Sequence, residues 1–183
     1  MSLASTRSLF FMAFIAGALA LGASYYLEYA IGLKPCGLCL LQRFFLALFT
    51  SVCVIAALHG PRRLGCLLYW LLSLFSSLAG MVTAWRHVVL QSDPAQQVSG
   101  CSHGLEGLFA NMPWLYVVKR LFNGTADCAE ISWTLFDLSI PEWSLLFFVA
   151  VTILGAYQIV QLAWYAYQRP PGGESSHRGR VGD

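Results

Sequence analysis

Two cysteines separated by two residues, Cys36 and Cys39, stand at the start of a long apolar stretch of the chain. Thiols at this spacing can form and break a disulfide bond that closes a small ring. Arg43 follows Cys39 by four residues and therefore lies on the same face of a helix, one turn further along. Its fixed positive charge can stabilise a thiolate or the oxygen of a reduced quinone. These residues predict thiol redox chemistry at a membrane surface, with a lipid-soluble electron acceptor.

The residue before the pair indicates how the two cysteines are positioned. Pro35 suits the beginning of a helix, so we expect Cys36 and Cys39 to lie in its first turn. There, amide N–H groups without intrahelical partners and the helix dipole stabilise a thiolate. An arginine so near the hydrocarbon is costly, which favours a functional role for Arg43. The alternative is that its side chain only extends to the lipid headgroups.

The other cysteines divide by their surroundings in the sequence. Cys101 and Cys128 lie in the long segment between the third and fourth apolar stretches, and a bridge between them would close a long loop that can present its sulfurs. They form a second pair beside the first. Cys53 and Cys66 lie inside apolar stretches, where a free cysteine is usually a small buried side chain. We expect these two to take no part in the mechanism.

The composition indicates which elements must position these residues. Apolar residues make up 57% of the 183 residues, charged residues make up 11%, and the mean hydropathy is +0.62. A soluble domain of this size could not bury so much apolar surface. The apolar residues form runs of about 20, the length that crosses a bilayer as a helix. The predicted fold is an all-α membrane protein, a four-transmembrane-helix bundle with spans at about 8–27, 40–58, 64–90 and 143–167.

The connections complete this single domain, predicted at 1–168. Residues 59–63 contain a helix stop and a break, so the second and third spans form a hairpin. The outer loops are 28–39 and 91–142, and the apolar segment Trp114–Phe122 predicts a short interfacial helix within the longer loop. Residues 169–183, rich in Pro, Gly and polar residues, predict a disordered tail. A cleaved signal peptide is the alternative for the first span.

Basic residues indicate the orientation in the membrane. Arg7 precedes the first span, Arg62 and Arg63 occupy the hairpin, and further arginines follow the fourth span. The positive-inside rule then places both termini and the hairpin in the cytoplasm, and both outer loops on the opposite side. Basic patches with interleaved aromatic residues are absent from the sequence, which argues against nucleic acid as a partner.

In these features the chain resembles the bacterial disulfide bond formation protein B (DsbB) family. Members of this family are membrane quinone reductases that reoxidise a periplasmic thiol oxidase. The resemblance covers nearly the whole chain, and the combination of motifs is specific although no single one is. The motifs that carry it are the Cys36/Cys39 pair with Arg43, the segment Trp85–Gln91, the segment Gly124–Glu130 with Trp133, and the segment Pro141–Trp143 that leads into the fourth span.

The resemblance implies a relay through two disulfides. A reduced DsbA-like partner would attack a Cys101/Cys128 disulfide and form a transient bond with Cys101. Cys128 would then exchange with Cys36. Cys39, nearer the quinone, would form the charge-transfer or covalent adduct that reduces ubiquinone or menaquinone. The implied location is the bacterial inner membrane, with both termini cytoplasmic and the redox loops periplasmic, and the implied role is to support disulfide formation in exported proteins.

The resemblance also suggests residues that bind the quinone. Arg43 is one, and His87, at the outer end of the third span, could hydrogen-bond a quinone carbonyl or move a proton as the ring is reduced. Without the resemblance, His87 would be only a polar helix end. Trp133 is the third candidate, with the aromatic belt at the membrane interface as its alternative.

Three other interpretations remain open at this point. The four outer cysteines could ligate zinc with His103 in reserve, but a compartment in which disulfides persist favours bridges, so we expect no metal. A quinone reductase of the vitamin K epoxide reductase type also has a Cys-x-x-Cys pair in a four-helix bundle, but we would expect its quinone-proximal pair late in the bundle. A non-catalytic scaffold with two structural disulfides would leave Arg43 and His87 without a role.

Overall fold

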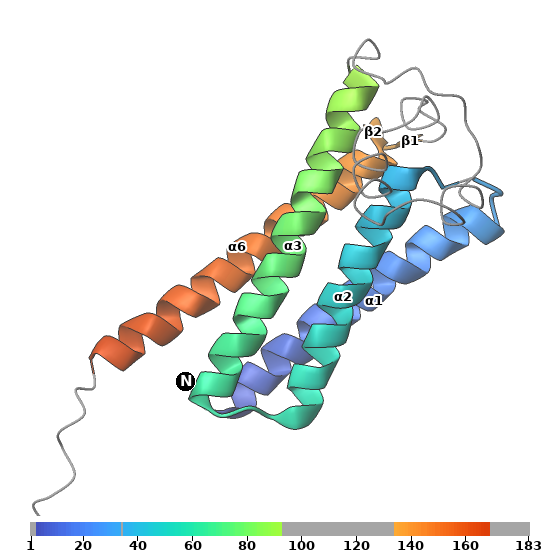
Figure 1. The fold of residues 1–183 in the computed structure, drawn as a ribbon. Coiled ribbons are helices and arrows are strands. Elements are labelled where there is room, and N and C mark those ends of the chain that lie inside the picture. Colours follow the sequence, from blue (N-terminus) through green and yellow to red (C-terminus); the bar gives the residue numbers. More distant parts are fainter. Residues whose placement is uncertain (1–2, 34, 93–133, 169–183) are drawn as a thin grey trace, which may run out of the picture.

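A computed structural model describes residues 3–33, 35–92 and 134–168 of the chain. Four long helices account for most of them: α1 (Leu3–Tyr29), α2 (Gly37–His59), α3 (Arg63–Ser92) and α6 (Ile140–Tyr167), shown in Figure 1. The predicted four-helix membrane bundle is confirmed. Helices α1, α2 and α6 begin a few residues before their predicted spans and α3 begins one residue before, because an apolar run marks the part that crosses hydrocarbon, while the helix itself continues through the polar interface.

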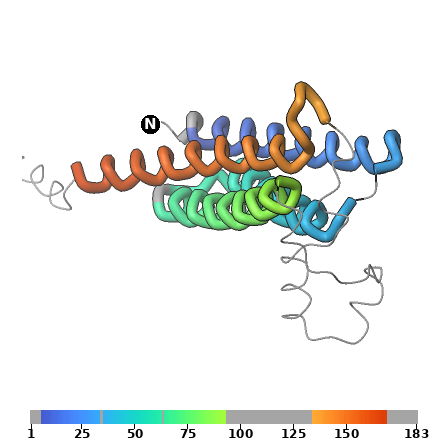
Figure 2. Tube along the Cα trace, turned by 90° about the horizontal axis from the view of Figure 1, so that it is seen from above, coloured from blue at the N-terminus to red at the C-terminus, as the bar shows by residue number. Residues whose placement is uncertain are grey.

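The helices pack in the order in which they occur in the chain. Helix α1 packs on α2, α2 on α3, and α3 on α6, as the two views in Figures 1 and 2 show. Large apolar side chains fill the centre, with Phe10 of α1 stacked on Trp70 of α3 at 4.4 Å between ring centroids. Cys53 and Cys66 are buried in the same core, as small apolar side chains would be. Their expected burial is therefore confirmed.

Two glycines allow neighbouring helices to approach closely. A Cβ atom at Gly80 of α3 would overlap the ring of the buried Phe148 of α6, and one at Gly17 of α1 would overlap the hydroxyl of Thr50 of α2. Small residues at helix contacts are typical of membrane bundles, where packing between helices replaces the hydrophobic effect. The bundle depends on these contacts, because lipid is as apolar as the helix surfaces it would otherwise cover.

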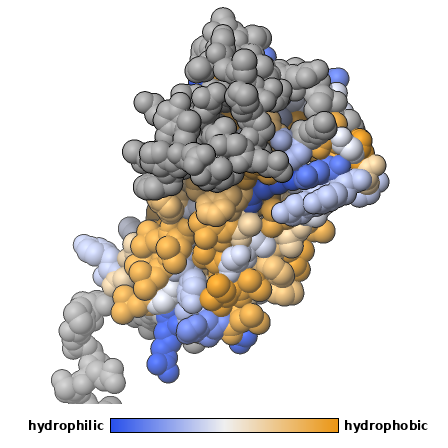
Figure 3. Space-filling model, turned by 45° about the vertical axis from the view of Figure 1, so that its right-hand side comes forward, coloured by the Kyte–Doolittle hydropathy of each residue, from blue (hydrophilic) through white to orange (hydrophobic). Residues whose placement is uncertain are grey.

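The outer surface of the bundle is apolar. Each of the four helices is long and apolar enough to cross a membrane, and many large side chains on them face outward, among them Phe44, Leu68, Phe75 and Ile153. Figure 3 shows apolar side chains over the flank of the helices and hydrophilic ones at the lower end. Such an outward face suits lipid and not water. The chain is a multi-pass membrane protein.

The connection between α2 and α3 closes one end of the bundle. Gly60 ends α2 in the left-handed conformation (φ 58°), and its N–H donates to the carbonyl of Ala56 at 3.1 Å. Arg7 of α1 donates from Nε to the carbonyl of Ala57 at 3.1 Å, so the start of α1 lies beside this turn. The amino end of α2, with the cysteine pair, lies at the opposite end of the bundle (Figure 1).

A small hairpin precedes α6 at the end that carries the cysteines. Strands β1 (Thr134–Leu135) and β2 (Leu138–Ser139) are antiparallel, and the two residues between them both have positive φ, as in a type I′ turn. The Ser139 N–H then donates to the Glu142 carboxylate at 2.6 Å, which caps the start of α6. The predicted interfacial helix, the rest of the long loop and the tail lie outside the described residues.

Candidate functional site

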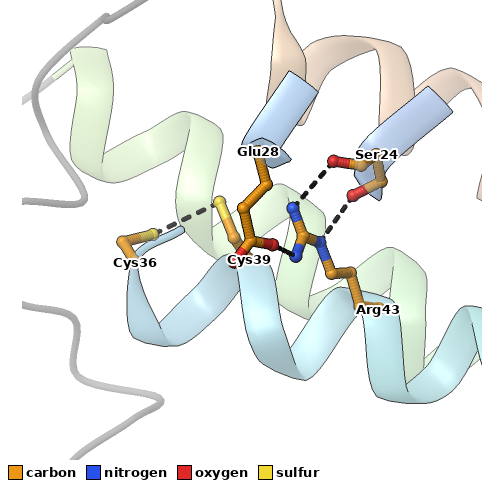
Figure 4. A network of polar contacts seen from close by, with 5 residues as sticks. All are labelled: Ser24, Glu28, Cys36, Cys39 and Arg43. Atoms are coloured by element: carbon orange, nitrogen blue, oxygen red, sulfur yellow. Dashed lines mark hydrogen bonds and ion pairs between the residues drawn. The ribbon is translucent and has the colours of Figure 1, made fainter. Parts of the chain in front are cut away.

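The Cys36/Cys39 pair lies at the beginning of α2, and the prediction that both residues lie in its first turn is correct for Cys39 only. Cys36 is the residue before the helix, with extended backbone angles, and its carbonyl accepts the N–H of Leu40 at 3.1 Å. Cys39 lies in the first turn. The two sulfurs stand as separate thiols 3.4 Å apart (Figure 4). Because a disulfide needs sulfurs about 2.05 Å apart, only a small movement of the side chains separates the reduced from the oxidised pair.

Arg43 is held by α1. Its guanidinium forms an ion pair with Glu28, and it donates to the hydroxyl of Ser24 and, at 2.9 Å, to the carbonyl of the same residue (Figure 4). It also lies over the ring of Tyr25, 5.1 Å from the centroid. The side chains of Arg43 and Glu28 are only 14% and 25% exposed. This arginine is therefore held between two helices by contacts within the protein.

A cavity of about 700 Å³ lies beside Arg43 and Cys39. Its walls come from α1, α2, α6 and the hairpin before α6, close to the amino end of α2. Most lining side chains are apolar, among them Leu27, Leu46, Trp143, Phe147 and Phe148, and the polar ones are few, among them Ser24, Glu28, Gln42, Arg43 and Ser144. A mostly apolar cavity with a few polar groups is typical of a site for a small organic ligand.

His87 lies beside Cys36, and its predicted contact with a quinone stays a prediction. It is buried on α3, 3% exposed, with Nε2 3.7 Å from the sulfur of Cys36. Cys36 and His87 are not among the residues that line the cavity, whereas Cys39 is. The two thiols therefore face different neighbours: Cys36 faces a histidine and Cys39 faces the cavity.

A short polar network continues from His87 to α6. Nδ1 of His87 lies 3.1 Å from the side-chain amide nitrogen of Gln42, and the hydroxyl of Ser144 donates to the amide oxygen of Gln42 at 2.6 Å. With the amide in this orientation, Gln42 donates to Nδ1, so Nε2 carries the ring proton and can donate to Cys36. Helices α2, α3 and α6 thus share one buried network that ends at a thiol.

The sequence predictions cover only part of this site. Ser24, Glu28, Gln42 and Ser144 escape them, although the sequence holds one signal: Glu28 is a carboxylate at the end of an apolar run, one of the few charges that could partner Arg43. Cys101, Cys128 and Trp133 lie outside the described residues, so their places beside this site stay predictions. Of the described residues, Cys36, Cys39 and His87 could together hold a metal ion, since their ligand atoms all lie within 4.8 Å of one another.

Comparisons with known proteins identify relatives along almost the whole chain. The family model of disulfide bond formation protein DsbB matches residues 6–158. The disulfide bond formation protein B 2 of Pseudomonas fluorescens is 59% identical over 183 residues, which is 100% of both chains. The disulfide bond formation protein B 1 of Pseudomonas aeruginosa is 42% identical over 163 residues, or 89% of this chain and 100% of that protein. The disulfide bond formation protein B of Stutzerimonas stutzeri is 42% identical over 161 residues, or 88% of this chain and 99% of that protein.

Proposed function

The chain belongs to the disulfide bond formation protein B (DsbB) family and is a membrane disulfide oxidoreductase, and we propose that it reoxidises a periplasmic DsbA-like thiol oxidase at the expense of a membrane quinone. Electrons would pass through two disulfide pairs, Cys101/Cys128 and then Cys36/Cys39. The alternatives, a vitamin K epoxide reductase-like enzyme and a non-catalytic scaffold, are not favoured by this family membership. The quinone, ubiquinone or menaquinone, takes up two electrons and two protons and leaves as quinol.

The cavity beside Cys39 fits a quinone ring. Its volume of about 700 Å³ and its mostly apolar walls suit an isoprenoid quinone, and it is bordered by lipid-facing helices. Arg43 at its wall is a fixed positive charge that can bind a quinone oxygen and stabilise it as it gains electron density. Trp133 remains a proposed further contact, since it belongs to the segment that leads into the hairpin.

The different surroundings of the two thiols are the main support for the proposed electron transfer from Cys39 to a quinone. Cys39 lines the cavity with Arg43, so its sulfur is the one that can deliver electrons to a ligand there. Cys36 faces His87 instead, which supports a role as the sulfur that exchanges with Cys128. The exchange would form a Cys36–Cys128 bond and release Cys39 as the thiolate. His87 can donate a hydrogen bond to the Cys36 thiolate once that mixed disulfide is resolved. In this proposal His87 acts on the thiol pair. Because His87 does not line the cavity, a quinone would have to extend past the lining residues to contact it.

The orientation proposed for the chain follows from its charges. Arg7 and the α2–α3 connection lie together at the end opposite the cysteine pair. Basic residues stay on the cytoplasmic side of bacterial inner membranes, so the pair would face the periplasm. This is the side on which disulfides persist and on which a DsbA-like partner would be found.

A direct test mixes purified protein with a reduced DsbA-like partner and a soluble quinone, and follows the quinone absorbance. We expect the wild-type protein and Cys53→Ser, a buried cysteine outside the relay, to consume quinone, and Cys39→Ser to consume none. Equal consumption by Cys39→Ser and wild type would refute the proposed delivery by Cys39. If Cys101→Ser or Cys128→Ser left partner oxidation intact, the loop pair would have no place in the relay.

A further inference from the structure

Three potential metal ligands converge at the amino end of α2. The sulfurs of Cys36 and Cys39 are 3.4 Å apart, Nε2 of His87 is 3.7 Å from Cys36, and all three atoms lie within 4.8 Å of one another. Ligand atoms held at about 2.0–2.3 Å by a tetrahedral zinc ion are separated by about 3.5–3.8 Å. The two measured distances already fall close to this range, so the three ligands could close around one ion with small side-chain movements.

We propose that the reduced protein binds one zinc ion through Cys36, Cys39 and His87, and that this ion inhibits the enzyme. On binding, the two thiols release two protons and become thiolates, and no electrons are transferred. The charge of Zn²⁺ and the two thiolates then cancels, which makes the complex tolerable beside hydrocarbon. In the oxidised protein the sulfurs are bonded to each other and supply no thiolate, so the site exists only in the reduced state.

Gln42 can support His87 as a ligand by turning its amide. A metal-bound histidine usually donates its other ring N–H to an oxygen. Half a turn of the Gln42 amide would bring its oxygen to His87 Nδ1, 3.1 Å away, and free Nε2 for the metal. Ser144 accommodates this turn, because its hydroxyl also lies 3.0 Å from the carbonyl of Pro141 and can donate there while accepting from Gln42.

Access and local charge also favour the site. Cys39 lines the cavity, so an ion can arrive there, and a water molecule can complete four ligands from that side. The nearby positive charge of Arg43 is offset by its ion pair with Glu28, which lessens its repulsion of a cation. The buried position of His87 holds its ring in place, so little side-chain freedom is lost on binding.

The inhibitory consequence rests on the proposed function. Zinc would hold the reduced pair as thiolates bound to metal and keep them from passing electrons to the quinone. Metal-free reduced protein would be reoxidised normally. Because zinc and the oxidised state exclude each other, we expect quinone to weaken apparent zinc affinity and zinc to slow quinone reduction.

The binding test uses full-length protein in detergent, without quinone. Zn²⁺ is titrated in competition with a chromophoric chelator, and Co²⁺ is added separately to detect thiolate-to-metal charge-transfer absorption. In a Cys101→Ser/Cys128→Ser background, which removes the other proposed pair, we expect one ion per chain in the reduced protein and none in the oxidised protein. Oxidised and reduced samples share one sequence and fold, so equal binding by both would overturn the proposal.

A histidine variant separates this site from a dithiol alone. We expect His87→Asn to lower the zinc affinity by at least about tenfold. Removing a residue that only hydrogen-bonds a metal ligand already lowers metal affinity by about tenfold or more, and His87 is itself a proposed ligand. His59→Asn, at the far end of α2, should bind as the wild type does. Unchanged affinity in His87→Asn would contradict the three-residue site. Zinc binding is measured without quinone or partner, so its failure and a failure of quinone reduction are separate results.

Discussion

At the scale of single residues, Glu28 offsets the positive charge of Arg43. The two side chains pair across α1 and α2 at the wall of the cavity, and Ser24 holds the guanidinium by two further hydrogen bonds. A free guanidinium beside the thiol would attract any anion that enters the cavity. Glu28 therefore limits the positive potential at Cys39, while Ser24 fixes where the guanidinium lies.

Glu28→Gln tests this division of roles, because glutamine keeps the shape of the side chain and an oxygen that can accept from Arg43. We expect reduced, quinone-free protein to react faster with iodoacetate relative to neutral iodoacetamide at Cys39. The ratio should rise by about fivefold, the factor that corresponds to roughly 1 kcal/mol, the upper end for a partly exposed ion pair. Asp137→Asn, which removes a carboxylate at the hairpin, should leave the ratio unchanged. The same ratio in Glu28→Gln as in wild type would contradict the role assigned to Glu28.

Local sequence was sufficient to predict some of these residues and not others. The placement of Cys36 and Cys39 depends on Pro35 and the apolar run beside them, and both are visible in the sequence. The contacts of Gln42 depend on α3 and α6, because Ser144 lies 102 residues away along the chain. Likewise, the face of α3 that meets Cys36 is fixed by how the helices rotate against each other, so the sequence could place His87 at the end of the third span but could not show that it lies beside Cys36.

At the scale of helices, the contact between α3 and α6 depends on the absence of a side chain at Gly80. The ring of Phe148 occupies the space where a Cβ would lie, and Phe148 is itself buried. A second link lies nearby, where the hydroxyl of Thr152 donates to Ser77 at 3.0 Å. Serines and threonines of α3 otherwise donate to carbonyls of their own helix, among them Ser73, Ser76 and Thr83.

Gly80→Ala should destabilise the bundle. Overpacking a tight contact costs about 1–3 kcal/mol, which exceeds the roughly 0.8–1 kcal/mol that alanine gains over glycine in a helix. Gly22→Ala is the matched control, because a Cβ there meets nothing within 4 Å. Thermal unfolding in detergent should show a lower midpoint for Gly80→Ala and an equal or higher one for Gly22→Ala. Equal midpoints for the two variants would show that Phe148 can move aside at little cost.

The helices themselves were predictable because their cause is local. A run of about 20 apolar residues needs no tertiary information to form a membrane helix, and Gly60 marks the end of α2 by its own conformational freedom. The hairpin before α6 was not predicted. Its turn residues, Phe136 and Asp137, are not the Asn-Gly or Gly-Gly pair that usually signals such a turn.

At the scale of the whole molecule, the two ends of the bundle differ in chemistry. One end carries Arg7 and the α2–α3 connection, and the other carries the thiol pair, the ion pair and the cavity. If the basic end is cytoplasmic, the loop with Cys101 and Cys128 is periplasmic. All steps of the proposed relay would then take place on one side of the membrane.

Thiol labelling of intact inner-membrane vesicles tests this orientation. With the reduced protein in inside-out vesicles, a membrane-impermeant maleimide should fail to reach Cys101. In right-side-out spheroplasts it should label Cys101 fully. A cysteine introduced by Arg62→Cys, in a background lacking the other cysteines, should give the reverse pattern. Labelling of Cys101 from the cytoplasmic face would reverse the proposed topology.

The hairpin before α6 carries an exposed aromatic side chain at the end of the bundle that holds the cavity. Phe136 at its tip is 83% exposed, and aromatic side chains of this kind settle at the boundary between headgroups and acyl chains. The hairpin is tied to the cavity wall, because Trp143 donates to the carbonyl of Leu135 at 3.1 Å and both residues line the cavity. The depth at which Phe136 rests in a bilayer is therefore linked to the depth of the cavity. If the ligand of this cavity is a membrane quinone, as proposed, acyl-chain length becomes a variable of the reaction, because a thicker or thinner bilayer shifts the cavity relative to the plane in which quinone rings travel.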